Sequence, residues 1–389
     1  MRRYILWLLI TGLLVVAGCS SQSGGDVLDP DLTDFPSSGI PDQNSLSISV
    51  DKYNPRARNI DGTAVTITVR LADQLGHNST ILDGTEVFFA TGTDGGSIES
   101  SCRTNNGACS VTWTSQDPRP DAGPAIVDPL GSGENVVSHS SGRSTVLVWT
   151  NGIESFIDEN SNGLFDDSDT QIDDVGDPFL DKDEDGVHDN GPLPASVPEE
   201  FVDFPIPSLG VGGTYDTADG LYSGPNCAHT TDCAVGQNAN ELFIFENIEI
   251  AMSSDSICIV PVDDAGTYWD SNVTFTEPVN LKTDRSSFSF LVHDCYGNPP
   301  MSGTTIEFES AVGADIIDDG GTVPNTSVDM GTTDTGGTRA RYPTNSLVYS
   351  AVVFEELDND EGEAGLLKIT VTNDVASVTY ALQLLDPMN

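Results

Sequence analysis

Residues 65–78 read V-T-I-T-V-R-L-A-D-Q-L-G-H-N, and they set the fold expected for much of this 389-residue chain. Apolar residues occupy the odd-numbered positions from Val65 to Leu71, so they share one face. Strict alternation is typical of a β-strand that buries one side. The polar and glycine-containing end of the stretch predicts a turn directly after that strand.

Further short runs of β-branched and aromatic residues surround this strand, each bounded by Gly, Asn, Asp or Pro. No stretch between residues 45 and 150 keeps a 3.6-residue apolar period, which argues against helices there. Asn151-Gly152 indicates a type I′ hairpin leading into a strand at Ile153–Ile157. Several short strands at this spacing predict an all-β fold built as a β-sandwich. The other expected strands are Leu46–Val50, Glu86–Ala90, Cys109–Thr114 and Ser144–Thr150.

The C-terminal third of the chain repeats this plan. Three stretches recur in the same order, which argues for two copies of one domain. Val65–Asn78 matches Ser287–Asn298, Asp83–Ala90 matches Ser302–Glu309, and Val148–Phe156 matches Thr370–Val378.

These stretches resemble the bacterial Ig-like domains of invasin and intimin type. In the first copy the resemblance is carried by Asp73–Asn78, Asp83–Phe88 and Thr104–Ser115, and in the second by Asp294–Asn298, Gly303–Phe308 and a weaker Thr333–Ala340. The second copy departs from the pattern in a long insert and in Cys295. The resemblance implies a stalk or spacer of a surface adhesin, and in some members a tip that binds host or carbohydrate partners.

Between the two copies lies an Asp-rich stretch, residues 154–189, with two sets of oxygen-bearing side chains at equal spacing. Each set occupies offsets 1, 3, 5 and 9, with glycine at offset 6, which is the spacing of a calcium loop. The first set is Asp158, Asn160, Asn162 and Asp166 with Gly163, and the second is Asp181, Asp183, Asp185 and Asp189 with Gly186. Two such sets in tandem predict Ca²⁺ binding, and the alternative is a turn-rich linker that binds nothing.

The expected sites differ from an EF-hand in their surroundings, because no helical pattern flanks either loop. The carbonyl groups of Leu164 and Val187 would serve at offset 7. Offset 12 holds Asp169 in the first loop and Pro192 in the second. The missing ligands could come from Asp167, Asp173, Asp174 or Asp177. In spacing alone, the loops resemble the calcium repeats of thrombospondin type 3 and dockerin proteins.

A third, degraded copy follows the second loop. Each copy begins with Phe-x-Asp, at Phe156–Asp158, Phe179–Asp181 and Phe201–Asp203. Gly213–Asp216 and Asp219-Gly220 could complete the third copy from a distance, and the three Phe residues are expected to pack as one apolar spine.

The formal net charge of −46 argues against nucleic acid as a partner. Arg2 and Arg3 precede an apolar run, which predicts a secretory signal. The tail V-A-G-C resembles the lipobox of bacterial lipoproteins. That resemblance implies cleavage after residue 18, a lipid on Cys19 that contacts the membrane, and an outer-membrane location. An ordinary secretory peptide with an incidental Cys is the alternative.

Six cysteines remain, and an even number in an oxidising compartment predicts three disulfides. Fifteen pairings are open, of which proximity favours Cys102–Cys109 and Cys227–Cys233, leaving Cys258–Cys295. A zinc site is the alternative, although no C-x₂-C pair supports it.

The domain plan has five parts: a signal peptide (1–18), a flexible tether (19–44), an Ig-like domain (45–157), a calcium-loop and disulfide-loop region (158–240) and a second Ig-like domain (241–389). No nucleophile motif, phosphate loop or metalloprotease motif is present, so no enzyme is expected. The predicted function is a surface module, structural or adhesive, with an unknown surface protein or polysaccharide as partner and Ca²⁺ stiffening the joint between the domains. The alternative is a receptor that uses Ca²⁺ directly to bind carbohydrate or protein.

Overall fold

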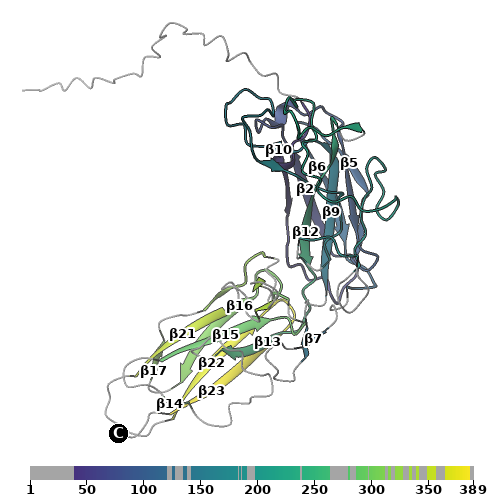
Figure 1. The fold of residues 1–389 in the computed structure, drawn as a ribbon. Helices are drawn as coiled ribbons and strands as arrows, with labels where there is room; N and C mark the ends of the chain where they lie inside the picture. The colour runs from purple at the N-terminus through teal and green to yellow at the C-terminus, as the bar shows by residue number, and fades with distance from the viewer. Residues whose placement is uncertain are drawn as a thin grey trace, which may run out of the picture. The chain divides into compact units, whose positions relative to one another are not determined.

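A computed structural model gives the fold of the chain (Figure 1). It describes residues 39–389 except 121–124, 128–134, 138–141, 183, 185, 191–197, 237–238, 263–278, 281–285, 297, 312–313, 317–319, 327–332, 335–338, 341–347, 356–363 and 386–389. The predicted signal peptide, Cys19 and most of the tether therefore lie outside the described residues. Helix in the described part consists of short 3₁₀ turns, among them Gln43–Ser45 and Asn78–Thr80, and no helix there could cross a membrane.

The first sandwich consists of two four-stranded sheets, as the alternating pattern of its strands predicts. The apolar positions from Val65 to Leu71 are buried between the sheets, where Trp113 joins them. One sheet has the order β1 (Leu46–Val50), β2 (Ala64–Leu71), β6 (Ala108–Thr114) and β4 (Ser97–Ile98). The other has the order β12 (Leu242–Ala251), β9 (Arg143–Gly152), β3 (Glu86–Thr91) and β5 (Ser101–Arg103).

The second sandwich has sheets of four and five strands around a separate apolar cluster that includes Phe290, Val292 and Ile369. The first sheet has the order β13 (Cys258–Val262), β15 (Ser286–His293), β21 (Val348–Glu355) and β17 (Ala314–Ile316). The second has the order β14 (Val279–Asn280), β23 (Ser377–Leu385), β22 (Ala364–Thr372), β16 (Thr305–Ala311) and β18 (Gly320–Thr322). Short pairs outside these sheets are β7 (Ala125–Val127) with β8 (Asn135–Val137), β10 (Ser155–Phe156) with β11 (Ile172–Asp173), and β19 (Thr333–Asp334) with β20 (Arg339–Ala340).

The two sandwiches repeat one pairing scheme. Strands β1, β2 and β6 pair in sequence, as do β13, β15 and β21. Likewise β3, β9 and β12 correspond to β16, β22 and β23. After β2, the Asp73 carboxylate accepts the N–H groups of Leu75 and His77, and after β15 the Asp294 carboxylate accepts those of Tyr296 and Asn298. The repeated order inferred from the sequence is therefore present in the fold.

Two details of the expected repeat are wrong. Val148 lies in the inter-sheet core, whereas Thr370, its match in sequence, lies on the outer face and hydrogen-bonds Thr379. The third match is thus one residue out of phase, and a one-residue slip exchanges the faces of a strand. The strand that corresponds to β6 is β21, not the stretch Thr333–Ala340, which forms the separate β19–β20 pair.

The second domain was expected to begin at residue 241, but the strand that follows this position belongs to the first sandwich. β12 pairs with β9 along its whole length, from Leu242 opposite Gly152 to Ala251 opposite Arg143. Asn151-Gly152 therefore lies in β9 and forms no hairpin, because the edge of β9 is occupied by β12. Residues 153–241, which we call the insertion, leave the first sandwich at the end of β9 and return to it at the start of β12.

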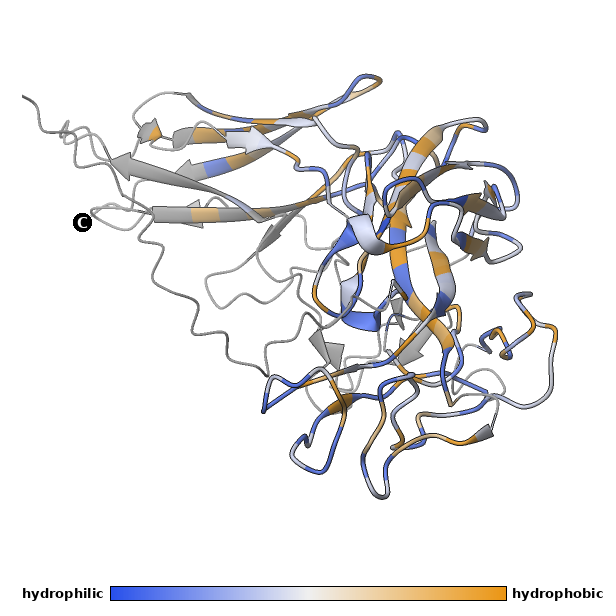
Figure 2. Cartoon of the chain, turned by 90° about the horizontal axis from the view of Figure 1, so that it is seen from above, coloured by the Kyte–Doolittle hydropathy of each residue, from blue (hydrophilic) through white to orange (hydrophobic). Residues whose placement is uncertain are grey.

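The insertion covers the outer face of this sheet. Leu147, Trp149 and Phe243 on that face pack with Leu180 and Val202 of the insertion in one buried cluster. Figure 2 shows apolar and polar residues alternating along several strands. By contrast, the run V-L-V-W in β9 is buried on both faces. Trp113 and Trp149 are thus both core residues, although they face different cores.

The two sandwiches are connected by residues 252–257, not by the insertion. Near this connection, Arg56 of the first sandwich forms a two-bond ion pair with Asp255, and the Asn54 amide donates to the carbonyl group of Pro300 at 2.7 Å. Ser253 donates to the carbonyl group of Pro299 at 2.7 Å. The described hydrogen bonds of this joint include no residue of the insertion, so the expected placement of the loop region between the domains is wrong.

All three disulfides pair as proximity in the sequence favours. Cys102–Cys109 links β5 to β6, Cys258–Cys295 links β13 to the turn after β15, and Cys227–Cys233 closes a small loop in the insertion. Zinc ligation by these cysteines is thereby ruled out in the described fold.

Candidate cation-binding loops

The two predicted loops of the insertion share their backbone conformation at offsets 4 and 6. Loop 1 spans Asp158–Asp166 and loop 2 spans Asp181–Asp189. Offset 4 has a positive φ in both, 59° at Ser161 and 57° at Glu184, and offset 6 has φ of 72° at Gly163 and 76° at Gly186. Glycine at offset 6 has no Cβ to oppose this conformation. Loops of equal spacing in the sequence thus match in φ at these two positions.

The oxygen-bearing side chains of loop 1 converge. The Asp158 carboxylate accepts the N–H groups of Asn162 and Gly163, at 3.1 and 2.6 Å. The amide groups of Asn160 and Asn162 donate to the Asp166 carboxylate, at 3.2 and 2.7 Å. Rotation of either amide by half a turn would present its oxygen where its nitrogen now lies. The donor set is therefore one of hard oxygen atoms, the ligands that Ca²⁺ prefers.

A buried carboxylate closes each loop. In loop 1, the Asp169 carboxylate accepts the N–H groups of Glu159 at offset 2 and Asp166 at offset 9, both at 2.9 Å. The N–H group of Asp169 donates in return to the Asp166 carbonyl group at 2.9 Å. Asp169, expected as the ligand at offset 12, is thus a cap for the loop backbone, although a carboxylate has further lone pairs.

Loop 2 has the same cap from a residue that the sequence reasoning missed. The Glu199 carboxylate accepts the N–H groups of Lys182 and Asp189, at 2.6 and 3.1 Å, and its own N–H donates to the Asp189 carbonyl group. Offset 12 of this loop, Pro192, lies outside the described residues, as do Asp183 and Asp185.

Loop 3 is the degraded third copy, and its parts come together as expected from a distance. The N–H group of Gly213 donates to the Asp203 carboxylate, as offset 6 donates to offset 1 in loops 1 and 2. The cap is Asp177, whose carboxylate accepts the N–H groups of Phe204 and Asp216, at 3.4 and 3.0 Å. Loop 3 therefore consists of Asp203 and Gly213–Asp216, and two of the residues between them, Phe204 and Leu209, pack against the cluster under the insertion.

A fourth copy is present that the sequence reasoning did not recognise. The Asp174 carboxylate accepts the N–H group of Gly220 at 2.5 Å, so Asp219-Gly220 belongs to loop 4 and not to loop 3. Its cap is Glu154, which accepts the N–H groups of Val175 and Ser223, at 3.0 and 2.6 Å. The sequence signal was Gly-x-aromatic-Asp/Ser, which occurs as G-L-F-D at 163, G-V-H-D at 186, G-T-Y-D at 213 and G-L-Y-S at 220.

The loops form two pairs that cap each other. Strand β10 before loop 1 pairs with β11 before loop 4, and Phe179 before loop 2 pairs with Phe201 before loop 3. Each cap precedes the first Asp of the partner loop. Glu154, Asp177 and Glu199 each lie four residues before that Asp, and Asp169 lies five residues before it. An acidic residue before Phe-x-Asp was the signal for three of the four caps.

Aromatic residues fill the space under each pair, in two clusters rather than the single spine expected. Under loops 1 and 4, Phe156 contacts Phe165 and Tyr222, with ring centroids 5.4 and 5.2 Å apart. Under loops 2 and 3, Phe179 and Phe201 pack edge-on against His188 and Tyr215, whose rings stack at 3.8 Å. Edge-to-face contacts of this kind stabilise beyond simple burial.

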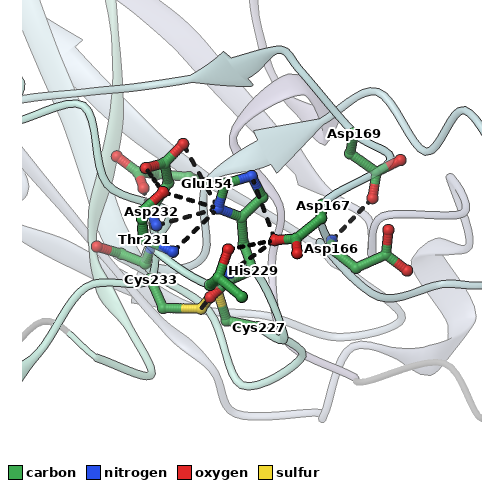
Figure 3. Close-up of a disulfide and its surroundings, with 11 residues drawn as sticks. Glu154, Asp166, Asp167, Asp169, Cys227, His229, Thr231, Asp232 and Cys233 are labelled. Carbon is green, nitrogen blue, oxygen red and sulfur yellow. Dashed lines mark hydrogen bonds and ion pairs between the residues drawn. A yellow bond between two sulfur atoms is a disulfide. The ribbon is translucent and has the colours of Figure 1, made fainter.

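The disulfide loop binds the first pair. Phe165 of loop 1 forms a parallel bridge with Cys227, and Tyr222 of loop 4 forms one with Cys233. Figure 3 shows His229 between Asp167 on one side and Thr231 and Asp232 on the other. Thr230 donates to Asp167 through its N–H and its hydroxyl group, both at 2.8 Å. Of the substitute ligands considered for the loops, Asp167 is thus engaged with the disulfide loop, Asp174 and Asp177 serve loops 4 and 3, and Asp173 lies in β11.

The acidic side chains of the insertion differ in how far their surroundings favour the charged carboxylate. The Ser168 N–H lowers the pKa of Asp166, and the Thr230 N–H lowers the pKa of Asp167. Burial raises the pKa of Glu154 to about 8 and the pKa of Asp177 to about 6, in spite of the N–H groups that each accepts. The caps of loops 3 and 4 therefore lie in less favourable surroundings for a carboxylate than the exposed side chains of loop 1.

Within the described residues, no three His, Cys, Asp or Glu side chains gather closely enough to hold a metal ion. In loop 1 the converging oxygen-bearing groups include two Asn, and in loop 2 two of the four Asp lie outside the described residues. The side chains at offset 7 point outward: Leu164 is 39% exposed and Val187 is 61% exposed.

No protein-family model and no curated protein sequence matches this chain. Among solved structures, the adhesin InvE of Yersinia pseudotuberculosis aligns with 9% identity and a TM-score of 0.22, over 89% of this chain and 60% of the adhesin. A β-glucuronidase of Parabacteroides merdae aligns with 7% identity and a TM-score of 0.21, over 87% of this chain and 24% of the enzyme. The chain thus spans less than two thirds of both, and similarity at this level has no bearing on its function.

Proposed function

We propose that this chain is a non-enzymatic surface lipoprotein, a structural or adhesive module in which Ca²⁺ bound to loops 1 and 2 stabilises the insertion. The observation that carries the calcium part is the repeated loop: equal φ angles at offsets 4 and 6, and the same bond from offset 6 to the Asp at offset 1. In loop 1 this backbone accompanies contacts among the side chains of Asn160, Asn162 and Asp166, whose oxygen atoms are of the kind that Ca²⁺ prefers.

The stabilising effect is assigned to the insertion and not to the joint between the sandwiches. The insertion lies on the outer face of β9 and β12, and its loops are closed by carboxylates of their partner loops. Divalent cations would reduce the repulsion among the many acidic side chains of the two loops. Lipidation at Cys19 would hold the module at the outer membrane, with a surface protein or polysaccharide as its partner.

Calorimetric titration of Ca²⁺ into the chelator-treated protein tests this proposal. We expect two binding events, one lost in Asp158→Asn and the other in Asp181→Asn, and none lost in the control variant Glu99→Gln on the first sandwich. Binding should leave the circular dichroism of the strands unchanged and slow hydrogen exchange in residues 158–234. Absence of Ca²⁺ binding in the intact protein, with both loops ordered, would refute the calcium role.

A calcium-dependent receptor is the second candidate function. It is favoured by the exposed apolar side chains of Leu164 and Val187, which occupy the same offset in loops 1 and 2. Large apolar residues on the surface mark interaction sites when they gather. Capture of polysaccharide or surface proteins that needs Ca²⁺, and that is lost in Leu164→Ser with Ca²⁺ affinity unchanged, would favour this function over a structural role.

A further inference from the structure

A cavity of about 390 Å³ lies between the two loop pairs and the first sandwich. Its walls come from the segment between loops 4 and 2 (residues 175–178), from loops 3 and 4, and from the start of β12. Ligand pockets typically have volumes of roughly 300–1,000 Å³. The cavity is therefore large enough for a small organic molecule.

The cavity combines acidic and aromatic groups. Four carboxyl residues line it: the caps Glu154 and Asp177, which are buried, and Asp216 and Asp219, which are exposed. No Lys, Arg or His is among its lining residues. Phe204, Tyr215 and Phe243 supply the aromatic surface.

The buried carboxylates are unusual because, among the described residues, no Lys, Arg or His lines the cavity beside them. Buried charges in proteins are normally paired with an opposite charge. Glu154 and Asp177 each accept two backbone N–H groups, and the Glu154 side chain also hydrogen-bonds the side chain of Asp174, which still leaves lone pairs on each carboxylate.

We propose that this cavity binds a small alkylammonium group, either of a free amine or of a lysine side chain. An ammonium group would donate charge-assisted hydrogen bonds to Glu154 and Asp177. Its alkyl chain and positive charge would lie against the rings of Phe204, Tyr215 and Phe243. A hard metal ion would use the carboxylates, but it would gain nothing from the aromatic wall and would fill little of the volume.

Binding of 1,4-diaminobutane to the full chain at saturating Ca²⁺ tests the proposal, because the calcium loops are then constant. We expect calorimetry to detect binding that falls at least tenfold in Glu154→Gln and in Asp177→Asn but not in Glu99→Gln. The uncharged 1,4-butanediol should not bind. Nα-acetyl-lysine amide separates the two sources: its binding indicates a lysine side chain, and its failure alongside diamine binding indicates a free amine.

Two further variants keep the test decisive if the buried substitutions unfold the insertion. Asp216→Asn changes an exposed lining residue, and Phe204→Leu removes aromatic surface at similar volume, so both should weaken diamine binding with no loss of folding. Equal binding of the diol, retention of affinity in Asp216→Asn and Phe204→Leu, or displacement of the diamine by additional Ca²⁺ would each overturn the proposal. The last result would identify a metal site instead, and none of these outcomes depends on whether loops 1 and 2 bind Ca²⁺.

Discussion

The two sandwiches differ most at one connection. In the second, residues 373–376 join β22 to β23, whereas in the first the insertion, residues 153–241, joins the corresponding β9 to β12. Strand pairing is complete in both cases. A long insertion between neighbouring strands costs little closure entropy beyond that of a short one, because the cost grows only with the logarithm of length. The comparison teaches that this edge of the domain can hold a second folded unit without loss of register.

The presence or absence of the insertion is reflected in the residue patterns of β9 and β22. In β22, Lys368, Thr370 and Thr372 alternate with buried Leu367, Ile369 and Val371, so one face meets solvent. In β9, both faces are apolar across residues 146–149 because the insertion covers the outer one. A continuous apolar run in a strand therefore indicates cover on both faces.

Substitution of the covered face should have the largest effect. Trp149→Ala removes a buried ring that stacks on Phe88 and packs with Leu180 and Val202. We expect a loss of about 3–5 kcal/mol in the free energy of unfolding, typical of a buried Trp→Ala change. Thr370→Ala, on the uncovered face of the second sandwich, should change it by no more than about 0.5 kcal/mol. Denaturation in urea measures both, and equal effects would show that the insertion does not cover β9 in solution.

The disulfides provide the next test. Cys258–Cys295 closes a separation of 37 residues and Cys227–Cys233 one of 6. In the chain-entropy description, removal of the longer link as a paired Ser variant should cost roughly 4 kcal/mol, and removal of the shorter link roughly 2 kcal/mol. Removal of Cys258–Cys295 should destabilise the second sandwich, and removal of Cys227–Cys233 should destabilise the insertion. Hydrogen exchange that reports loosening of both regions in either variant would contradict this separation.

Much of the fold could be predicted from the sequence, because alternation and turn chemistry are local. Strands β1, β2, β3 and β6 and the Asp-x-x-Gly turn at Asp73 follow from such signals, whereas the short β4 and β5 were not predicted; all three disulfides pair as neighbours. The role of β12 could not be predicted in this way. Its partner β9 lies across the insertion, and alternation in a strand carries no information about which strand it joins.

The candidate site was predicted in part for the same reason. Loops 1 and 2 are contiguous, so their spacing is visible, whereas loop 4 joins Asp174 to Gly220. The caps Glu199 and Glu154 are likewise remote from the loops that they close. Reciprocal capping is a tertiary property, and the Gly-x-aromatic pattern that accompanies it has meaning only once the pairs of loops are known.

The pH dependence of stability should have opposite signs in the two regions. Burial raises the pKa of Glu154 to about 8, so its neutral form is favoured in the folded state. Its stabilising contribution to the free energy of unfolding is fully present below the pKa of Glu154 in the unfolded state. This contribution is lost as pH rises toward 8, by up to about 1.4 kcal/mol per pH unit. Glu154→Gln should flatten this slope in urea denaturation monitored through the insertion.

His293 of the second sandwich supplies the contrast. Burial lowers the pKa of His293 to about 4. Its stabilising contribution to the free energy of unfolding is therefore lost as pH falls from about 6.5 toward 4. The pH slope of the second sandwich should therefore be unchanged in Glu154→Gln. A flattened slope in the second sandwich would mean that the two regions unfold as one unit.

The smallest expected effect concerns two glycines in comparable turns. Gly186 of loop 2 has φ of 76° and Gly303, before β16, has φ of 88°, and a Cβ at either position would meet no atom within 4 Å. Substitution by Ala should thus cost only the backbone penalty, about 1 kcal/mol at each position. Asn tolerates this conformation better than Ala, so Gly186→Asn should recover part of the loss.

The region in which the Gly→Ala variants lose stability shows whether the insertion unfolds as a cooperative unit of its own. We expect native-state hydrogen exchange to show faster opening of residues 158–234 in Gly186→Ala, with β15 and β22 unaffected, and the reverse in Gly303→Ala. Equal losses for Ala and Asn at Gly186 would exclude backbone conformation as the cause. Faster opening throughout the chain in both variants would show that the insertion and the second sandwich share one unfolding transition, despite the separate clusters that form their cores.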